Sequence, residues 1–147
     1  MSQEGHTERR PGYLVKRVQQ LLRHECDREL RDGGVTISQY AVLRALDEHP
    51  GASSAELARL CFVTRQSLQD VLSGLRSNGL VEVADRPTTG RARPARLTPL
   101  GVQRLARAGE VMASVEDRML AGFGAEERDL LSGLLIRCTE NLAGGSE

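Results

Sequence analysis

Aromatic residues are scarce in this 147-residue sequence, which contains two Phe, two Tyr and no Trp. The core must therefore be aliphatic, and an aromatic platform on which the bases of single-stranded nucleic acid could stack is largely excluded. No stretch approaches the roughly 18 consecutive apolar residues that a membrane span needs. Residues 1–10 also lack the hydrophobic segment of a secretion signal. We therefore expect a cytoplasmic protein that has no membrane partner.

Cysteine is scarce as well, and the three cysteines are too few and too irregularly spaced for a disulfide framework. His24 and Cys26 are two residues apart on an expected helix and face different directions, so they do not form a metal-binding pair. The sequence also has no Gly-rich nucleotide-binding loop, no nucleophile elbow and no HExxH motif. We therefore expect a protein that is not an enzyme and needs no metal and no cofactor.

Charge is balanced overall, with 20 basic and 20 acidic residues, but it is unevenly distributed. Residues 61–100 contain six arginines against three acidic residues, whereas residues 101–147 contain five arginines against eight. Lys16 is the only lysine, and the guanidinium group of arginine suits bidentate contact with phosphate or guanine. This segregation is compatible with an anion-binding face on a neutral protein, and also with an ordinary solvated surface of mixed charge.

Apolar residues recur at helical spacing in several segments separated by Gly, Pro and capping residues. The expected helices cover residues 11–31, 38–49, 53–60, 64–78, 98–120 and 126–142. The third of these opens with a capping box in which Ser53 supplies the cap and Glu56 reaches back. Thr64 is a suitable cap for the fourth, which Asn78-Gly79 ends with a left-handed turn.

The fourth expected helix has two chemically distinct faces. Its apolar residues fall within an arc of about 100°, and they are Leu68, Val71, Leu72 and Leu75. The opposite arc carries Arg65, Gln66, Gln69, Asp70, Ser73, Arg76 and Ser77. Arg, Gln and Ser side chains can hydrogen-bond to base edges and phosphates, so this face is typical of a DNA-recognition helix.

A short hairpin is expected after this helix. Leu80–Asp85 alternates like a strand, and Pro94–Leu97 can return as an edge strand. The turn-rich loop between them holds Arg86, Arg91 and Arg93. Two short helices, a polar-faced helix and a basic hairpin together predict a winged helix-turn-helix, a mainly α fold with a small β-hairpin.

The Leu-rich helices at both ends of the sequence also require a partner surface, because a body this small can hardly bury them within itself. Packing these helices between two chains would give an isologous homodimer. We therefore expect flexible tails at 1–10 and 144–147, dimerisation helices at 11–34 and 99–143, and a winged helix-turn-helix at 35–98.

Five segments carry a family resemblance that extends over residues 11–142. They are Ser38–Leu46, Glu56–Ala58, Val63–Leu68, Leu75–Val81 and Leu97–Gly101. In these segments the sequence resembles the MarR (multiple antibiotic resistance regulator) family of bacterial transcription factors. The resemblance implies a homodimer that binds pseudo-palindromic double-stranded DNA, commonly as a repressor released by a small molecule or by oxidation.

The resemblance also implies which residues contact DNA. The major groove would be read by Thr64, Arg65, Gln66, Ser67 and Gln69. Ser53 and Arg76 complete the expected helical contacts, and Arg86, Arg91 and Arg93 would serve the wing. Family wings usually carry an Asp-Arg-Arg type tip, where this sequence has Thr89-Gly90-Arg91. We therefore expect a looser tip, and which arginine enters the minor groove stays open.

The sequence leaves open two ways in which DNA binding could be regulated. In the first, an aromatic or acidic effector binds between the dimer helices and the winged unit, where Tyr13, Arg17 and Tyr40 offer hydroxyls and a charge. The alternative for these residues is that the tyrosines pack and Arg17 is solvated. Cys26 or Cys61 could sense oxidation, but an apolar environment makes Cys26 a packing residue, as it does Cys138. A winged helix that contacts only proteins, without an operator of its own, is the remaining alternative.

Overall fold

The structure is a computed structural model that describes residues 4–83 and 95–144. Its helices are α1 (Glu4–Thr7), α2 (Pro11–Leu30), the 3-10 turn η1 (Arg31–Gly33), α3 (Ile37–Glu48), α4 (Ser54–Leu60), α5 (Arg65–Ser77), α6 (Pro99–Met119) and α7 (Ala125–Gly144). Its strands are β1 (Val81–Val83) and β2 (Ala95–Leu97). The predicted fold class, mainly helical with one small hairpin, is confirmed. The chain divides into two compact units, residues 1–115 and residues 116–147.

Side-chain caps define where α3 and α4 begin. Thr36 caps α3 with a full capping box, because its hydroxyl accepts from the Gln39 amide at 3.1 Å while the Gln39 side chain accepts from the Thr36 amide at 3.1 Å. The cap is thus Thr36, two residues before the expected start at Ser38. Ser53 caps α4 as predicted, but the Glu56 carboxylate accepts from the Ser53 hydroxyl at 3.2 Å instead of from the backbone.

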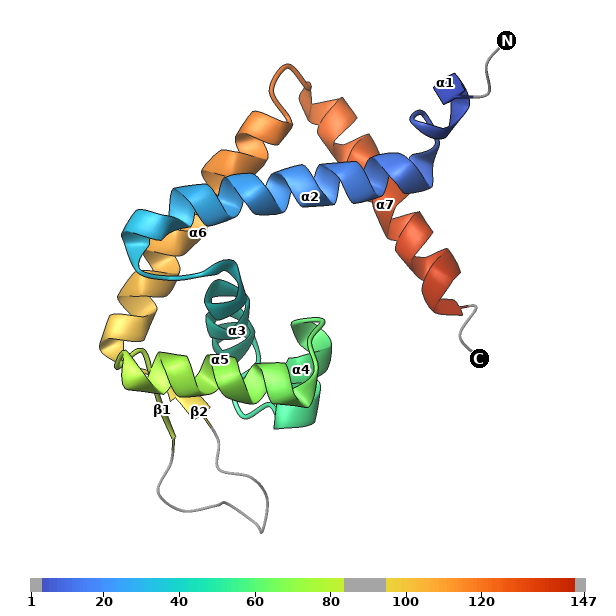
Figure 1. The fold of residues 1–147 in the computed structure, drawn as a ribbon. Coiled ribbons are helices and arrows are strands. Elements are labelled where there is room, and N and C mark those ends of the chain that lie inside the picture. The colour runs from blue at the N-terminus through green and yellow to red at the C-terminus, as the bar shows by residue number, and fades with distance from the viewer. Residues whose placement is uncertain (1–3, 84–94, 145–147) are drawn as a thin grey trace. The chain divides into compact units, whose positions relative to one another are not determined.

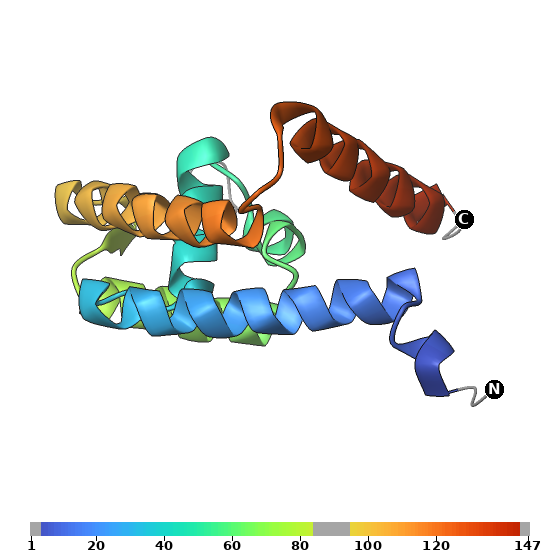
Figure 2. The ribbon, with the colours of Figure 1, turned by 90° about the horizontal axis from the view of Figure 1, so that it is seen from above.

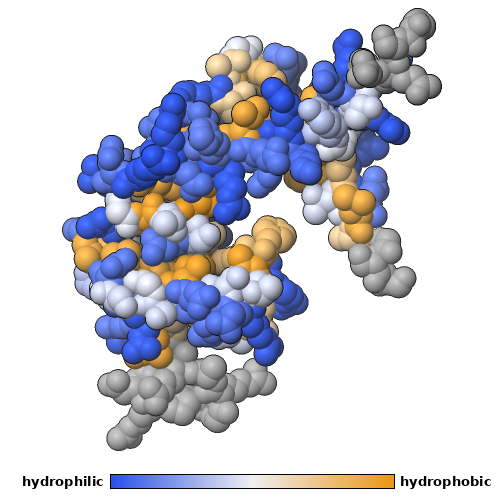
Figure 3. Space-filling model, in the orientation of Figure 1, coloured by the Kyte–Doolittle hydropathy of each residue, from blue (hydrophilic) through white to orange (hydrophobic). Residues whose placement is uncertain are grey.

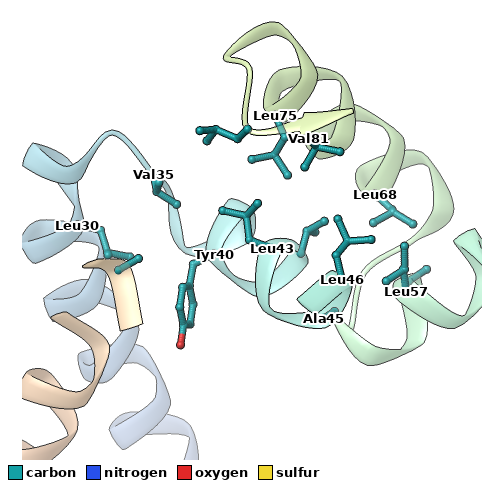
Figure 4. Close-up of a cluster of buried hydrophobic side chains, with 14 residues drawn as sticks. Leu30, Val35, Tyr40, Leu43, Ala45, Leu46, Leu57, Leu68, Leu75 and Val81 are labelled. Carbon is teal, nitrogen blue, oxygen red and sulfur yellow. The ribbon is translucent and has the colours of Figure 1, made fainter. Parts of the chain in front are cut away.

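The core lies where α3, α4, α5 and β1 meet (Figure 4). Leu43 of α3 packs with Leu68 and Leu75 of α5, and all three are fully buried. Val71 and Leu72 are half-buried beside them, so the predicted apolar arc of α5 does face the core. Burying this arc fixes the opposite, polar arc of α5 toward the outside.

The hairpin lies at the C-terminal end of α5, and α4 lies at the N-terminal end (Figure 1). Its strands are antiparallel, with Val81 opposite Leu97 and Val83 opposite Ala95. Gly79 ends α5 with a φ of 74°, and the Leu80 amide donates to the Leu75 carbonyl at 2.9 Å, as a left-handed C-cap requires. The hairpin is therefore joined to α5 without a flexible linker.

Helix α6 is anchored to the same unit at its first turns. The Thr98 hydroxyl donates to the Gly79 carbonyl at 2.6 Å and accepts from the Gly101 amide at 3.0 Å. Further along, Arg104 donates to the Gly33 carbonyl at 2.8 Å, and Ala108 is buried against the core cluster. Seen from above, α3 runs crosswise to α2 and α6 (Figure 2).

Many apolar side chains of α2 and α7 lie outside this core. Leu14, Val18 and Leu21 of α2 are exposed, and no described residue of α7 is buried. Figure 3 shows apolar side chains at the surface over the C-terminal half of α7. No helix in the described ranges has both the length and the apolar character that crossing a bilayer requires.

Candidate DNA-binding interface

The first turn of α5 is held rigid by its cap. The Ser67 amide donates to the Thr64 hydroxyl oxygen at 3.1 Å, and that hydroxyl donates in turn to the Ser67 side chain at 3.1 Å. Arg65 and Gln66 follow the cap directly, and both are exposed. Four of the residues that were expected to read the major groove therefore lie on one ordered, solvent-facing helical turn.

The side chains of Gln66 and Gln69 on this face are positioned by hydrogen bonds. Gln66 donates through Nε2 to Oδ1 of Asp70 at 3.3 Å, along the helix. Gln69 donates through Nε2 to the hydroxyl of Ser54 at 3.4 Å, which connects α5 to the first residue of α4. The start of α4 thus lies beside the polar face of α5, and the two helices form one surface.

A groove of about 570 Å³ opens where α4, α5 and the hairpin meet. Its lining includes apolar residues as well as polar ones, here called the rim, which carry hydroxyl, amide and guanidinium groups. The rim residues are Ser53, Ser54, Gln69, Ser73, Arg76 and Ser77. These are the donors that proteins use to bind phosphate oxygens, so the groove can accept a sugar-phosphate backbone that passes between α4 and the hairpin.

The arginines of this surface are available for an anion. Arg65 and Arg76 are exposed, and neither makes an ion pair with any residue in the described parts of the chain. Arg96 of the hairpin differs, because it pairs with Glu82 across the strands at 2.6 Å. Arg86, Arg91 and Arg93 of the wing lie outside the described residues, as does the Thr89-Gly90-Arg91 tip.

Sequence reasoning missed three serines of the rim as site residues. Ser73 and Ser77 were assigned to the polar arc only, and Ser54 was not singled out. A signal was present for two of them, because Gln69, Ser73 and Ser77 recur every four residues and so share one helical row. Ser54 carries no such signal, since only the packing of α4 on α5 brings it to Gln69.

A second, smaller groove of about 350 Å³ is lined by residues of α3, together with Leu60 of α4 and Met112 of α6. Tyr40, Arg44, Glu48 and Met112 are among the residues that line it. Arg44 donates to Glu48 at 2.9 Å; this hydrogen bond raises the pKa of Arg44 and lowers the pKa of Glu48. An acidic ligand in the groove would therefore compete with Glu48 for the Arg44 guanidinium.

Only one of the three expected effector residues lines this groove. Tyr40 is buried at its edge, whereas Tyr13 and Arg17 are exposed on the N-terminal half of α2. Within the described residues of one chain, the three side chains therefore do not form a common pocket. Arg44 is the charged group beside Tyr40, and it lies one helical turn after it in the sequence.

The cysteines occupy three different environments. Cys26 of α2 is fully buried, in agreement with a packing role. Cys61 is half-buried in the turn before α5, where its thiol donates to the Ala41 carbonyl at 3.6 Å, and burial raises the pKa of this thiol. Cys138 is exposed on α7, so the described residues do not provide the packing that was expected for it.

Comparison with known proteins gives consistent matches. The model of the MarR family matches residues 33–92. The HTH-type transcriptional repressor Rv2887 of Mycobacterium tuberculosis is 38% identical over 117 residues, which cover 80% of this chain and 84% of that protein. Its structure in complex with salicylic acid aligns with a TM-score of 0.73 at 36% identity, covering 88% of this chain and 96% of that chain. The structure of the transcriptional repressor CouR bound to a 23-mer DNA duplex aligns with a TM-score of 0.83 at 28% identity, covering 95% and 99%.

Proposed function

The chain belongs to the MarR family and is a winged-helix DNA-binding transcriptional regulator, and from this premise we propose how its own residues bind an operator. The polar face of α5 enters the major groove, and the groove between α4, α5 and the hairpin receives the backbone of one strand. The protein acts as a homodimeric repressor of a pseudo-palindromic site, and a small aromatic or acidic molecule releases it.

One observation supports this proposal most strongly. Arg65 and Arg76 stand on the same exposed face of α5, outside any ion pair with a described residue, on a chain whose net charge is zero. Side chains that only solubilise a helix are more often paired with opposite charges three or four residues away. Uncommitted guanidinium groups beside Gln and Ser side chains are suited to guanine edges and phosphates.

The residues divide into two roles. Base reading falls to the first turns of α5, and its residues are Thr64, Arg65, Gln66, Ser67 and Gln69. Backbone contact falls to Ser53, Arg76 and the wing arginines Arg86, Arg91 and Arg93. Residues 35–98 thus form the DNA-binding region, with dimerisation assigned to 11–34 and 99–143. A regulator of this kind acts where the DNA is, which in bacteria is the cytoplasm.

A gel-shift assay with the DNA upstream of the protein's own gene tests the assignment of α5. Wild type is expected to bind one site in the presence of competitor DNA, and to bind less tightly at higher salt. Arg65→Ala should reduce the preference for that site over random DNA by about 1–3 kcal/mol if Arg65 reads a guanine. Arg107→Ala, an exposed arginine on α6, is the control and should bind as wild type does.

Two results would contradict the assignment. If Arg65→Ala keeps the wild-type preference and salt dependence, α5 does not read bases through Arg65. If wild type binds no site upstream of its gene and also selects none from a random DNA library, the protein-contact alternative is favoured over an operator-binding role.

The effector site is proposed at the groove beside Tyr40 and Arg44. The salicylic acid complex belongs to Rv2887, but an aromatic carboxylate also suits the apolar floor and the guanidinium of this groove. Tyr13 and Arg17 would contribute from α2 of the partner or the same chain. Salicylate should weaken operator binding by wild type, whereas Arg44→Gln should need a higher salicylate concentration for the same release. Equal release of the two proteins would exclude Arg44 as the carboxylate partner.

A further inference from the structure

Asp70 places a carboxylate on the polar face of α5, the face that is proposed above to enter the major groove. It lies about 200° around α5 from Leu68 and about 140° from Leu75, the two fully buried residues, and therefore points directly away from the core. Its side chain is exposed. If α5 enters the major groove as proposed above, a carboxylate stands on the surface that approaches the DNA, one turn after Gln66 and at the edge of the polar arc away from Arg65 and Arg76.

A carboxylate in this position is unfavourable for general DNA binding. The DNA backbone carries one negative charge for every ~1.7 Å of helix axis, so Asp70 opposes the attraction that Arg65 and Arg76 supply. Among the described residues, no ion pair neutralises this charge, and Asp70 accepts one hydrogen bond, from the uncharged amide of Gln66.

The hydrogen bond to Gln66 also determines what the pair can recognise. Gln66 donates one Nε2 hydrogen to Oδ1 of Asp70, so Oδ2 of Asp70 remains as an acceptor, and Gln66 keeps its carbonyl oxygen and its second Nε2 hydrogen. Because an ionised carboxylate can only accept, Asp70 requires a donor on the DNA. In the major groove the exocyclic amino groups of cytosine and adenine are the donors, and a carboxylate pairs best with N4 of cytosine, since it cannot donate to N7 of adenine.

We propose that Asp70 is a specificity-determining residue that accepts a hydrogen bond from the amino group of one cytosine in each operator half-site. This inference rests on the proposed function, and adds a base and an atom to it. Where cytosine is present, the hydrogen bond offsets the repulsion of the carboxylate by the backbone. Where another base is present, the repulsion remains, and Asp70 therefore lowers the affinity for random DNA.

Selection of binding sites from a random DNA library, carried out in parallel with three full-length proteins, tests the proposal. Wild type is expected to select a cytosine at one position of each half-site. Asp70→Asn has nearly the same shape but can both donate and accept, as adenine requires, so it should shift the preference at that position from cytosine to adenine by about tenfold or more. Asp70→Ala should lose the preference at that position and keep it at the others.

Asp47→Asn is the matched control, because it removes the same charge from an exposed aspartate of α3 that is not on the α5 face. It should select the same sites as wild type. Thermal unfolding of each protein shows whether the substituted chains are folded, since Asp70 is exposed and its loss should change the melting temperature little.

The outcomes separate this inference from the proposed function. A wild type that selects no sequence would contradict both. A wild type that selects a site, together with an Asp70→Asn variant that selects the same one, would overturn the cytosine contact and leave the regulator assignment in place. If Asp70→Asn binds all sequences more tightly by the same factor, the carboxylate only repels DNA, and the inference is equally wrong.

Discussion

Gly101 lies where α6 passes close to Leu80, the residue that precedes β1 of the hairpin. A Cβ added there would overlap the carbonyl oxygen of Leu80 and lie 3.0 Å from its carbonyl carbon, and backbone atoms cannot move away as a flexible side chain can. We expect Gly101→Ala to lower the free energy of unfolding by about 1–3 kcal/mol. Urea unfolding at fixed protein concentration measures this loss.

Gly109, on the same helix, is the matched control for that substitution. Its added Cβ would meet only the Tyr40 hydroxyl oxygen, at an ordinary contact distance of 4.0 Å. Because alanine favours a helix over glycine, Gly109→Ala should leave stability unchanged or raise it by up to about 1 kcal/mol. A similar loss in both variants would show that the close approach at Leu80 is not the cause.

Phe62 combines a left-handed backbone with an almost fully solvated side chain. Its φ is 56° and the residue is 95% exposed, so the aromatic ring contributes little packing to offset the strain. A residue with a Cβ in this conformation is destabilised by about 1 kcal/mol or more relative to glycine. Phe62→Gly should therefore be more stable than Phe62→Ala by about 1 kcal/mol in urea unfolding. The opposite order, which is usual at ordinary positions, would rule out strain at Phe62.

Cys61 provides a test of the redox alternative. Burial raises the pKa of its thiol, so at neutral pH a smaller fraction is thiolate than in an unstructured cysteine. Alkylation of Cys61 in the native protein, followed by mass spectrometry, should be slower than in the unfolded chain, and its rate should level off at a higher pH. Equal rates in the two states near neutral pH would make Cys61 a candidate oxidation sensor.

Local chemistry made several of these residues predictable and left others hidden. Ser53 and Thr64 were identified as caps because capping depends on residues only three positions apart. The contact between Gln69 and Ser54 joins residues fifteen positions apart, and no periodic pattern encodes it. The same holds for the place of Tyr40 and Met112 along one groove, which depends on how α6 packs on α3.

At the scale of elements, α5 and the wing should make different contributions to binding. The double variant Arg91→Ala, Arg93→Ala removes two wing cations that are expected at the backbone or minor groove. Its affinity should fall by a similar factor for operator and random DNA, and the slope of log K against log salt should become shallower by about 2. Binding titrations at several salt concentrations measure both. An unchanged slope would place neither arginine at a phosphate.

Element order was predictable from periodicity and turn chemistry, whereas the boundaries of most helices differ from the expected ones by one or two residues. The apolar rows gave the six longer helices, and the strand pattern gave the hairpin that pairs Val81 with Leu97. The start of α3 was expected at Ser38, but the reciprocal bonds of Thr36 and Gln39 begin the helix at Ile37. The rim of the α5 groove also escaped prediction, because it needs α4 and the hairpin at the two ends of α5.

At the scale of the whole molecule, we expect the exposed apolar side chains of the terminal helices to pack against a second chain. Leu130 and Leu134 lie one turn apart on α7, both are exposed, and contiguous apolar surface of this kind marks a protein interface. The variant Leu130→Glu, Leu134→Glu should have the mass of a single chain in light scattering, because it places two charges in the proposed interface. Ser132→Glu, which adds a charge to the same helix outside this leucine row, should remain a dimer.

The dimer also predicts the spacing of the two operator half-sites, which wild type and the double variant of α7 can test. A two-fold dimer presents two copies of α5, so its half-sites should lie about one DNA turn, or ~34 Å, apart. Inserting about half a turn of DNA between the half-sites rotates one of them to the other side of the duplex, and wild-type affinity should then fall to that of a single half-site. The double variant Leu130→Glu, Leu134→Glu is expected to be monomeric and to bind single half-sites, so the same insertion should leave its affinity unchanged. If the insertion weakens both proteins equally, the two half-sites are not read by one dimer.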